Sequence, residues 1–319
     1  VMTIAKSRSF YYSLKPFIPR PLQLMLRRRV IKQKLKSCRS VWPINNMINT
    51  LPPKNWNGWP SKKKFTLVLT HDVETKIGHD RCESVMQLEK QLGFKSSFNF
   101  VPERYTVSKQ LRETIEQNGF EVGVHDLKHD GFLFKSKSSF QKKADRINKY
   151  IKEWNVSGFR AGAMLHNLSW INYLNIVYDA STFDTDPFEP QPVGIDTIFP
   201  FFVQDKTGRG YIELPYTLPQ DFTLFVLMKE KNIDVWIKKL DWIVKHQGMV
   251  LVITHPDYMN FPNKNKAFDE FPVKLYQDFL SYIKTKYAGQ YWNGLPVEIA
   301  QFWRQKHTNA TRHLCKSFK

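Results

Sequence analysis

The chain has 319 residues, of which 42% are hydrophobic and 24% charged, a balance typical of one large or two modest globular domains and not of a disordered polymer. The longest unbroken apolar runs, such as 249–253, have about five residues where a membrane-spanning helix needs roughly 20, so no transmembrane segment is predicted. Arg8, Lys15 and Arg20 interrupt every apolar stretch near the start. We therefore expect no secretion signal, and the cytoplasm is the predicted compartment.

The positive charge is concentrated at the N-terminus. The formal net charge is +19, yet residues 1–64 contain 15 Lys or Arg and no Asp or Glu, while the other 255 residues carry 33 basic and 29 acidic side chains. Net charge therefore gives little support to a nucleic-acid-binding main domain. The cysteines, Cys38, Cys82 and Cys315, are odd in number and far apart, and we interpret them as free thiols.

Residues 1–60 are predicted to form a basic N-terminal arm, followed by a single domain over 61–319. A basic, moderately amphipathic helix is expected over 21–37, because Pro21 suits a first helical turn and leucines recur among arginines and lysines. Proline and tryptophan residues over 42–60 predict a rigid, extended connector. The arm has three open interpretations: packing on the main domain, attraction to an anionic membrane surface at the inner membrane face, and nucleic-acid binding, which only the net charge supports.

From residue 65 onward, short β-rich runs alternate with amphipathic helical stretches. Strands are expected at 65–70, 96–101, 120–124, 157–160, 177–181, 198–203, 211–214 and 249–254. Helices are expected near 85–92, 108–118, 138–151, 167–176, 232–247, 268–286 and 296–305. This repeated strand-then-helix order predicts an α/β fold with a parallel sheet that is closed, or nearly closed, into a barrel.

Polar residues follow several of these apolar strands. In a β/α barrel the carboxyl ends of the strands meet on one face, where active sites lie. The polar strand ends are 70–74, 125–129, Arg160, Asp179 and 254–257. We therefore take them as the candidates for chemistry.

Some of these residues are of the types that bind metals. His125 and His129 are four apart, so one helical turn or tight loop can direct both imidazoles to one point. A carboxylate from another loop, Asp72 or Glu74, would complete a site of two histidines and one carboxylate, and the other acid would remain as a base. Arg160 at the end of a buried strand needs a carboxylate partner. Taken singly, each has an ordinary structural interpretation, as a core or surface histidine, a solvated acid or a surface arginine.

Taken together, the pattern resembles the five motifs of the polysaccharide deacetylase family, the NodB-like domain of carbohydrate esterase family four. That family shows T-F-D-D, H-S/T-x-x-H, R-x-P, an aspartate motif and a late L-x-H. The similar segments here are Thr70-His71-Asp72-Val73-Glu74, His125 to His129, Arg160-Ala161-Gly162, Tyr178-Asp179-Ala180-Ser181 and Val252-Ile253-Thr254-His255. The resemblance covers about residues 65–305. It implies a distorted, incomplete barrel of about seven parallel strands and metal-dependent hydrolysis of an N-acetyl or O-acetyl group on a sugar.

The resemblance also implies roles for the matching residues. They are general base for Asp72, metal ligand for His125 and His129, orientation of the base for Arg160, and general acid for His255. Val73 stands where the family has a metal-binding aspartate, so Glu74 becomes the expected third ligand, as in branches of the family that spell the motif D-V-D or D-V-E. Gly162 replaces the family's proline. Asp179 is expected to hold the His255 imidazole, with Asp184, Asp186 and Asp257 as competitors.

The expected function is metal-dependent removal of acetyl groups from a saccharide, in a cell-surface polysaccharide or its lipid- or nucleotide-linked precursor. A divalent ion, zinc above all, lowers the pKa of bound water and polarises the carbonyl. Asp72 would take the water's proton, and His255 would protonate the departing nitrogen. Two alternatives stay open: a C–N hydrolase using the same site on a non-saccharide amide, and a catalytically silent glycan-binding module.

Overall fold

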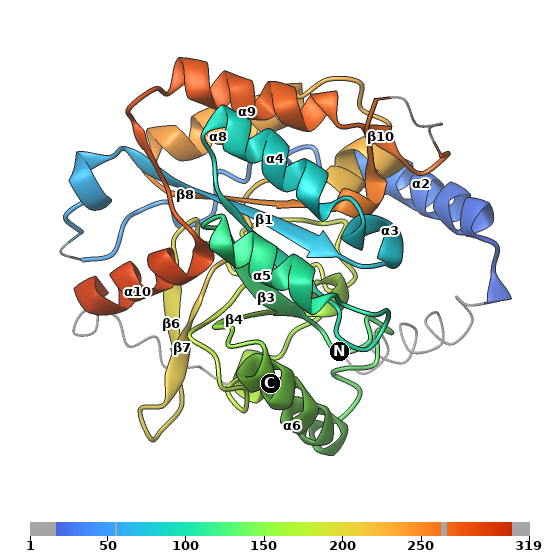
Figure 1. Cartoon of the computed structure of the whole chain (residues 1–319). Helices are drawn as coiled ribbons and strands as arrows, with labels where there is room; N and C mark the ends of the chain where they lie inside the picture. The colour runs from blue at the N-terminus through green and yellow to red at the C-terminus, as the bar shows by residue number, and fades with distance from the viewer. Residues whose placement is uncertain (1–16, 55, 263–266, 308–319) are drawn as a thin grey trace.

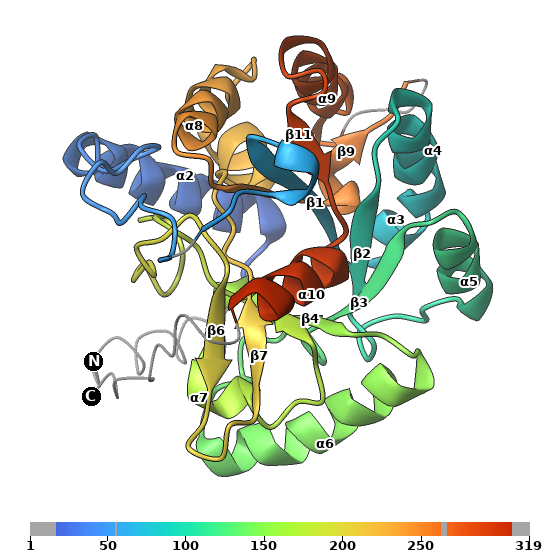
Figure 2. The ribbon, with the colours of Figure 1, turned by 90° about the vertical axis from the view of Figure 1, so that its left-hand side faces the viewer.

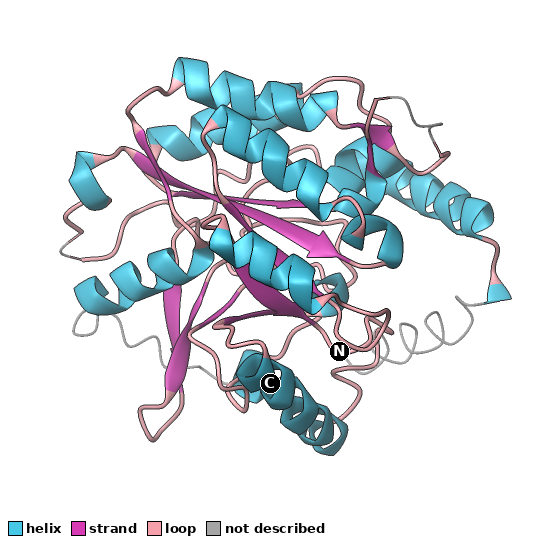
Figure 3. Cartoon of the chain, viewed as in Figure 1, coloured by secondary structure: helices cyan, strands magenta, loops and turns pink. Residues whose placement is uncertain are grey.

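The structure, a computed structural model, describes residues 17–54, 56–262 and 267–307 (Figure 1). Residues 1–16 of the expected arm and Cys315 lie outside the described residues. A curled sheet forms the centre, and helices surround it (Figure 3). None of the helices within the described ranges combines the length and the apolar content that a bilayer span requires.

The main sheet contains nine of the described strands. They are β1 (Phe65–Val73), β2 (Ser96–Phe100), β3 (Glu121–His125), β4 (Gly158–Arg160), β5 (Tyr178–Asp179), β6 (Phe201–Gln204), β7 (Gly210–Glu213), β8 (Met249–Thr254) and β11 (Tyr291–Asn293). Their order is β11-β1-β2-β3-β4-β5-β7-β6, and β8 also pairs with β1. All pairs are parallel except β6 with β7. The prediction of a distorted β/α barrel of about seven parallel strands is confirmed, since eight of the nine strands pair in parallel and only β6 runs the other way.

The sheet differs from the expected one at three strands, and one of them, β11, was not predicted at all. β1 continues past Thr70 to Val73, because the imidazole of His71 is fully buried between the Thr254 hydroxyl (2.7 Å) and a Glu89 carboxylate oxygen (2.9 Å). β6 runs antiparallel to β7, because a tight turn joins the two strands; in it the Asp205 carboxylate accepts a hydrogen bond from the Thr207 amide at 2.8 Å.

Irregular chain beyond β7 closes the barrel against β8. The Thr217 amide donates to the Leu251 carbonyl (3.2 Å), and the Thr217 hydroxyl donates to the Met249 carbonyl (2.9 Å) and accepts from the Leu251 amide (3.0 Å). The Ile198 carbonyl accepts from the Met249 amide at 2.8 Å. One threonine side chain thus supplies contacts that a neighbouring strand would make, which explains why the barrel is distorted.

The longer helices cover the outside of the sheet (Figures 1 and 2). Helices of at least nine residues are α2 (Arg20–Ser37), α4 (Cys82–Leu92), α5 (Lys109–Gln117), α6 (Lys137–Glu153), α8 (Asp234–Lys245), α9 (Lys274–Lys286) and α10 (Pro296–His307). Shorter elements are η2 (Pro60–Lys62), α3 (Lys76–His79), η3 (Gly162–Met164), α7 (Leu168–Ile171), the π-helix η4 (Phe222–Met228), η5 (Pro256–Tyr258) and the pair β9 (Met259–Asn260) and β10 (Phe271–Pro272). The expected helix at 167–176 is therefore a single turn, and η4 was not predicted.

The two ends of the barrel are closed differently. At the end where β1 begins, α10 lies across the strands (Figure 2), and Trp303 packs there with Trp56, Trp59 and Phe199 at ring-centroid distances of 5.3 to 6.2 Å. These tryptophans are structural. Helix α2 packs through buried Leu24 and lies beside η4, toward the end where β1 finishes (Figure 1).

Candidate active site

The carboxyl ends of β1, β3, β4 and β8 bring the candidate residues to one end of the barrel. Asp72 lies in β1, His125 and Arg160 end β3 and β4 and are register partners, and His255 follows β8. β8 pairs with β1, β2 lies between β1 and β3, and β4 pairs with β3; all these pairs are parallel, so the strand ends share a level. Glu74 enters from the loop after β1.

Glu74, His125 and His129 form a metal-type donor set, since one ligand atom from each lies within 4.8 Å of the others. His125 Nδ1 donates to the Arg160 carbonyl at 3.1 Å. This hydrogen bond fixes the tautomer and leaves Nε2 unprotonated, with its lone pair available to a metal ion. This buried Nε2 has no hydrogen-bond partner among the described residues. Burial lowers the pKa of His125 to about 4, so its imidazole is neutral, as a metal ligand must be. The residues therefore fit a divalent ion.

The position of the His129 imidazole depends on the small size of Gly162. Its Nε2 lies 3.1 Å from Glu74 Oε1; burial disfavours the charged imidazole, but the carboxylate of Glu74 raises the pKa of His129. A Cβ added to Gly162 would stand 2.8 Å from Cδ2 of His129 and 2.5 Å from the Asp126 carboxylate. That carboxylate accepts a hydrogen bond from the Gly162 amide at 3.2 Å. Gly162 thus leaves the room that His129 needs.

Among the described residues, hydrogen-bond donors reach only one of the two carboxylate oxygens of Asp72. Its Oδ1 accepts hydrogen bonds from Arg160 Nη1 (2.9 Å) and Asn99 Nδ2 (3.1 Å), while Oδ2 lies 3.8 Å from His125 Nε2. Burial favours the neutral acid, but the charges of Arg160 and His255, with the Asn99 hydrogen bond, lower the pKa of Asp72 to about 2. Oδ2 is therefore free to accept a proton.

The expectation that Asp179 holds His255 is wrong. Asp179 Oδ1 accepts a hydrogen bond from the Ser181 hydroxyl at 2.6 Å, and the acid pairs with buried Glu213. Burial raises the pKa of Asp179 to about 6, and the nearby charge of Arg160 opposes this rise. Asp179 is therefore engaged by Ser181 and not by His255. The competing acids are engaged elsewhere, with Lys239 for Asp184, Tyr216 for Asp186, and the Glu74 amide and Thr75 hydroxyl for Asp257.

Asp221 takes the position that was expected for Asp179. Its Oδ1 lies 2.7 Å from His255 Nδ1, and its Oδ2 accepts the His255 backbone amide at 2.7 Å. Burial would lower the pKa of His255, but the charge and hydrogen bond of Asp221, with Glu74 and Asp72, raise it to about 10. His255 is thus a charged imidazolium at neutral pH. Only one signal in the sequence marked Asp221: it is a lone acid directly before an apolar run, the place of a helix N-cap.

The N-terminal arm reaches the metal-type site. Tyr258 donates through its hydroxyl to Glu74 Oε2 at 3.3 Å, and the same hydroxyl accepts from Arg20 Nη2 at 3.1 Å. A cavity opens in front of the site, and α2 forms one of its walls. Its lining includes Arg20, Arg27, Glu74, His129, Glu189, Phe222, His255 and Tyr258.

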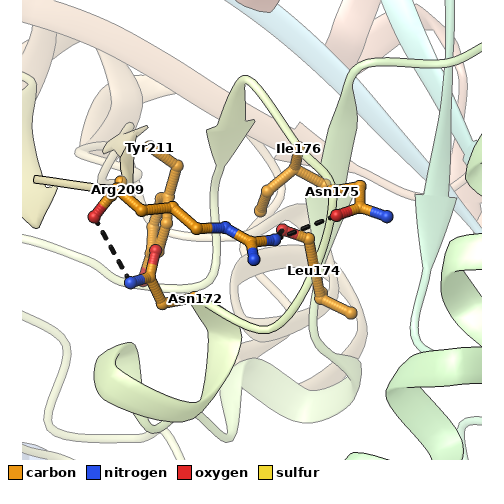
Figure 4. A pocket seen from close by; sticks show the side chains of 7 residues that line it. Asn172, Leu174, Asn175, Ile176, Arg209 and Tyr211 are labelled. Carbon is orange, nitrogen blue, oxygen red and sulfur yellow. Dashed lines mark hydrogen bonds between the residues drawn. The ribbon is translucent and has the colours of Figure 1, made fainter. Parts of the chain in front are cut away.

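A second cavity lies away from these residues, where α7 leads into β5 and where β7 begins (Figure 4). The guanidinium of Arg209 crosses it and donates to the Asn175 side chain at 2.9 Å, and Tyr211 forms part of the lining. None of the candidate residues lines this cavity. The first cavity, which Glu74, His129 and His255 line, is therefore the one that belongs to the candidate site.

Comparison with known proteins supports the fold. No protein-family model matches the chain, and no curated protein matches its sequence. A protein from Mycobacterium smegmatis assigned as a polysaccharide deacetylase matches with a TM-score of 0.60 at 17% identity, over 82% of this chain and 98% of that chain. Puue allantoinase matches with a TM-score of 0.59 at 14% identity, over 78% of this chain and 93% of that chain. A Pseudomonas aeruginosa protein assigned as a polysaccharide deacetylase matches with a TM-score of 0.58 at 12% identity, over 78% of this chain and 94% of that chain. The chain has the polysaccharide deacetylase fold, as its motifs predicted.

Proposed function

We propose that the chain is a metal-dependent hydrolase that removes an acetyl group from an N-acetylated or O-acetylated sugar of a polysaccharide or its precursor. One observation carries the proposal: a donor set of two histidines and one glutamate lies next to an ionised Asp72 and a charged His255, beside a cavity that Glu74, His129 and His255 line. A divalent ion such as zinc, when bound to Glu74, His125 and His129, supplies the Lewis acidity that activates water and polarises a carbonyl. The deacetylase fold supports this assignment.

Asp72 is the general base of the proposed reaction. Arg160 and Asn99 both bind Oδ1, so Oδ2 is the atom that accepts the proton of the attacking water. Their contacts keep the carboxylate ionised and fix its direction. A base already deprotonated across the neutral range contributes typically 10² to 10⁴ in rate.

His255 is the general acid. An amine is a poor leaving group until it is protonated, and His255 carries the proton that it requires at neutral pH. Asp221 binds Nδ1, which leaves Nε2 to donate toward the cavity. Asp221 also stabilises the imidazolium until the transfer takes place.

Two measurements test the proposal. Elemental analysis of the purified protein should find about one divalent ion per chain, lost in a His125→Ala/His129→Ala double variant. Acetate release from N-acetylglucosamine oligomers should then fall at least ~10²-fold in Asp72→Asn, with thermal unfolding recorded as the control for folding. Full activity in Asp72→Asn, or no bound metal after dialysis against zinc, refutes the mechanism.

The fold match to an allantoinase favours one alternative, hydrolysis of a non-saccharide C–N bond by the same residues. The two reactions differ in their products, because a deacetylase releases acetate from acetylated sugars. Amine release from small amides without acetate release from sugars would favour the alternative. Sugar binding without turnover would instead indicate a silent glycan-binding module.

We also propose that the outer face of α2 contacts an anionic membrane surface. Leu22, Met25, Leu26 and Val30 are 42% to 51% exposed there, next to exposed basic residues such as Arg29. Apolar side chains bordered by arginine and lysine suit an anionic lipid interface.

Sedimentation with anionic vesicles tests this surface. Leu26→Glu/Val30→Glu should abolish binding, whereas Tyr173→Glu, which alters a 40% exposed ring next to the second cavity, should not. Deleting the arm is unsuitable, because α2 also lines the active-site cavity. Equal sedimentation of the double variant and the wild type would exclude the membrane role.

A further inference from the structure

The inner face of α2 brings arginines to the active-site cavity. Arg20 and Arg27 line it together with Glu74, His129 and His255. Arg27 stacks over the Phe222 ring with its guanidinium carbon 4.8 Å from the ring centroid. The same ring lies 6.5 Å from the imidazole of His255, centroid to centroid. One aromatic side chain thus separates Arg27 from the proposed general acid.

Arg27 differs from Arg20 and Arg28 on the same helix in having no polar partner among the described residues. Arg20 is paired with Asp269 (3.3 Å) and Tyr258 (3.1 Å), and Arg28 donates to the Val226 carbonyl at 3.1 and 3.2 Å. Arg27 has no hydrogen bond or ion pair with any residue that the structure describes. A half-buried guanidinium has several donors to satisfy, so this one is available to a ligand.

Two carboxyl groups line the cavity: Glu74 is engaged by His129 and Tyr258, and Glu189 does not neutralise Arg27. Glu189 Oε1 accepts from the Tyr216 hydroxyl (2.7 Å) and from Gln220 Nε2 (2.5 Å). Burial and the charge of Asp186 raise the pKa of Glu189 to about 8, although Arg27 lowers it. Glu189 is therefore mainly uncharged at neutral pH, and the positive charge of Arg27 remains uncompensated on the cavity wall.

We propose that the substrate is an anionic saccharide and that Arg27 binds its negatively charged group, a carboxylate or a phosphate. The planar guanidinium matches either group with two parallel hydrogen bonds, and the Phe222 ring holds its plane in place. The inference rests on the proposed function and specifies its substrate class. It also gives the arm a role in specificity.

Kinetics with matched sugars test the inference. The substrates are N-acetylglucosamine, its 1-phosphate and the corresponding N-acetylated uronic acid. Arg27→Ala should lower kcat/KM for the charged sugars about 10- to 100-fold more than for the neutral sugar, mainly through KM. Arg27→Lys should recover part of the loss. Lys36→Ala removes a charge from the same helix at an exposed position outside the cavity, and should leave the preference unchanged.

Calorimetry separates failure of the inference from failure of the proposed function. The wild type should bind the sugar phosphate and the uronic acid more tightly than the neutral sugar, and Arg27→Ala should lose this difference. If no sugar is hydrolysed but the Arg27-dependent binding persists, hydrolysis fails and the anion site stands. Equal binding of charged and neutral sugars, or a preference that Arg27→Ala leaves intact, overturns the inference. A preference for only one charged sugar identifies the group as carboxylate or phosphate.

Discussion

Replacing Asp221 with Asn removes one negative charge beside His255 and keeps the size of the side chain. The pKa of His255 is raised from 6.5 to about 10, and Asp221 is the strongest influence acting against burial. A rise of this size corresponds to roughly 5 kcal/mol in favour of the imidazolium, at about 1.4 kcal/mol per unit. Removing Asp221 withdraws the largest part of this stabilisation. The pKa of His255 should then fall by at least ~1 unit.

Activity requires a protonated His255, so a lower pKa removes the acid at a lower pH. The alkaline limb of the pH profile of kcat/KM should therefore move to lower pH in Asp221→Asn. Above the lowered pKa, kcat/KM should fall, with ~10²- to 10⁴-fold as the range for losing a general acid. Acetate release measured from about pH 5 to about pH 10 gives both quantities.

Asp179→Asn is the matched control, because Asp179 is bonded to Ser181, whereas His255 is bonded to Asp221. It should leave the alkaline limb in place. Asp221→Asn also disturbs the hydrogen bonds to the His255 and Phe222 amides, so thermal unfolding is measured for each variant. Lost stability lowers the amplitude of the profile but does not displace its limb. A displaced limb in Asp179→Asn together with an unchanged one in Asp221→Asn would refute the assignment.

Three further substitutions test the site and the barrel. Gly162→Ala places a methyl group 2.8 Å from His129 Cδ2, so metal affinity should fall ~10- to 100-fold, and equilibrium dialysis with zinc measures it. Burial raises the pKa of Glu121 to about 7 from 4.5, so the folded state favours its neutral form and loses stability as the pH rises through this range. The wild type should lose up to ~3 kcal/mol of stability from this ionisation, and Glu121→Gln should not. The free energy of unfolding of the variant should therefore decrease less between about pH 5 and pH 8. Thr217→Val leaves a carbonyl and an amide of β8 unpaired and should cost ~2 to 4 kcal/mol in urea unfolding, whereas Thr217→Ser should cost less.

Each of these three predictions would be contradicted by one result. Unchanged zinc affinity in Gly162→Ala would mean that the loop carrying His129 moves without cost. Parallel pH dependence of stability in Glu121→Gln and the wild type would mean that Glu121 is ionised in the fold. Equal stability of Thr217→Val and Thr217→Ser would mean that the hydroxyl does not close the barrel.

The strands and the metal-type cluster were predictable because their signals are local. The run from Phe65 is apolar and β-branched, and the four-residue spacing of His125 and His129 restricts where both imidazoles point. The parallel order β1-β2-β3-β4 then brings the ends of these strands to one level without any further information. Local pattern and sheet geometry together therefore predict most of the site.

Asp221 could not be assigned from the sequence, because its role depends on the packing of η4 against the end of β8. It lies 34 residues before His255, in a segment without a motif. Asp179 was preferred because it matched a motif by order along the chain. Order does not determine which face of a strand a side chain occupies, and Asp179 turns toward Ser181 and Glu213.

The arm was separated from the barrel because the charge of the chain changes near residue 64, but composition does not report long-range contacts. Arg20 reaches Tyr258, 238 residues away, and Tyr258 bonds to the metal-type ligand Glu74. Partners of a metal ligand fix its direction and commonly influence affinity. Displacing α2 should therefore loosen Glu74 through Tyr258 and remove Arg27 from the cavity wall at the same time. The arm and the barrel form one proposed catalytic unit, so contact of α2 with a membrane would bring the cavity close to a membrane-linked substrate.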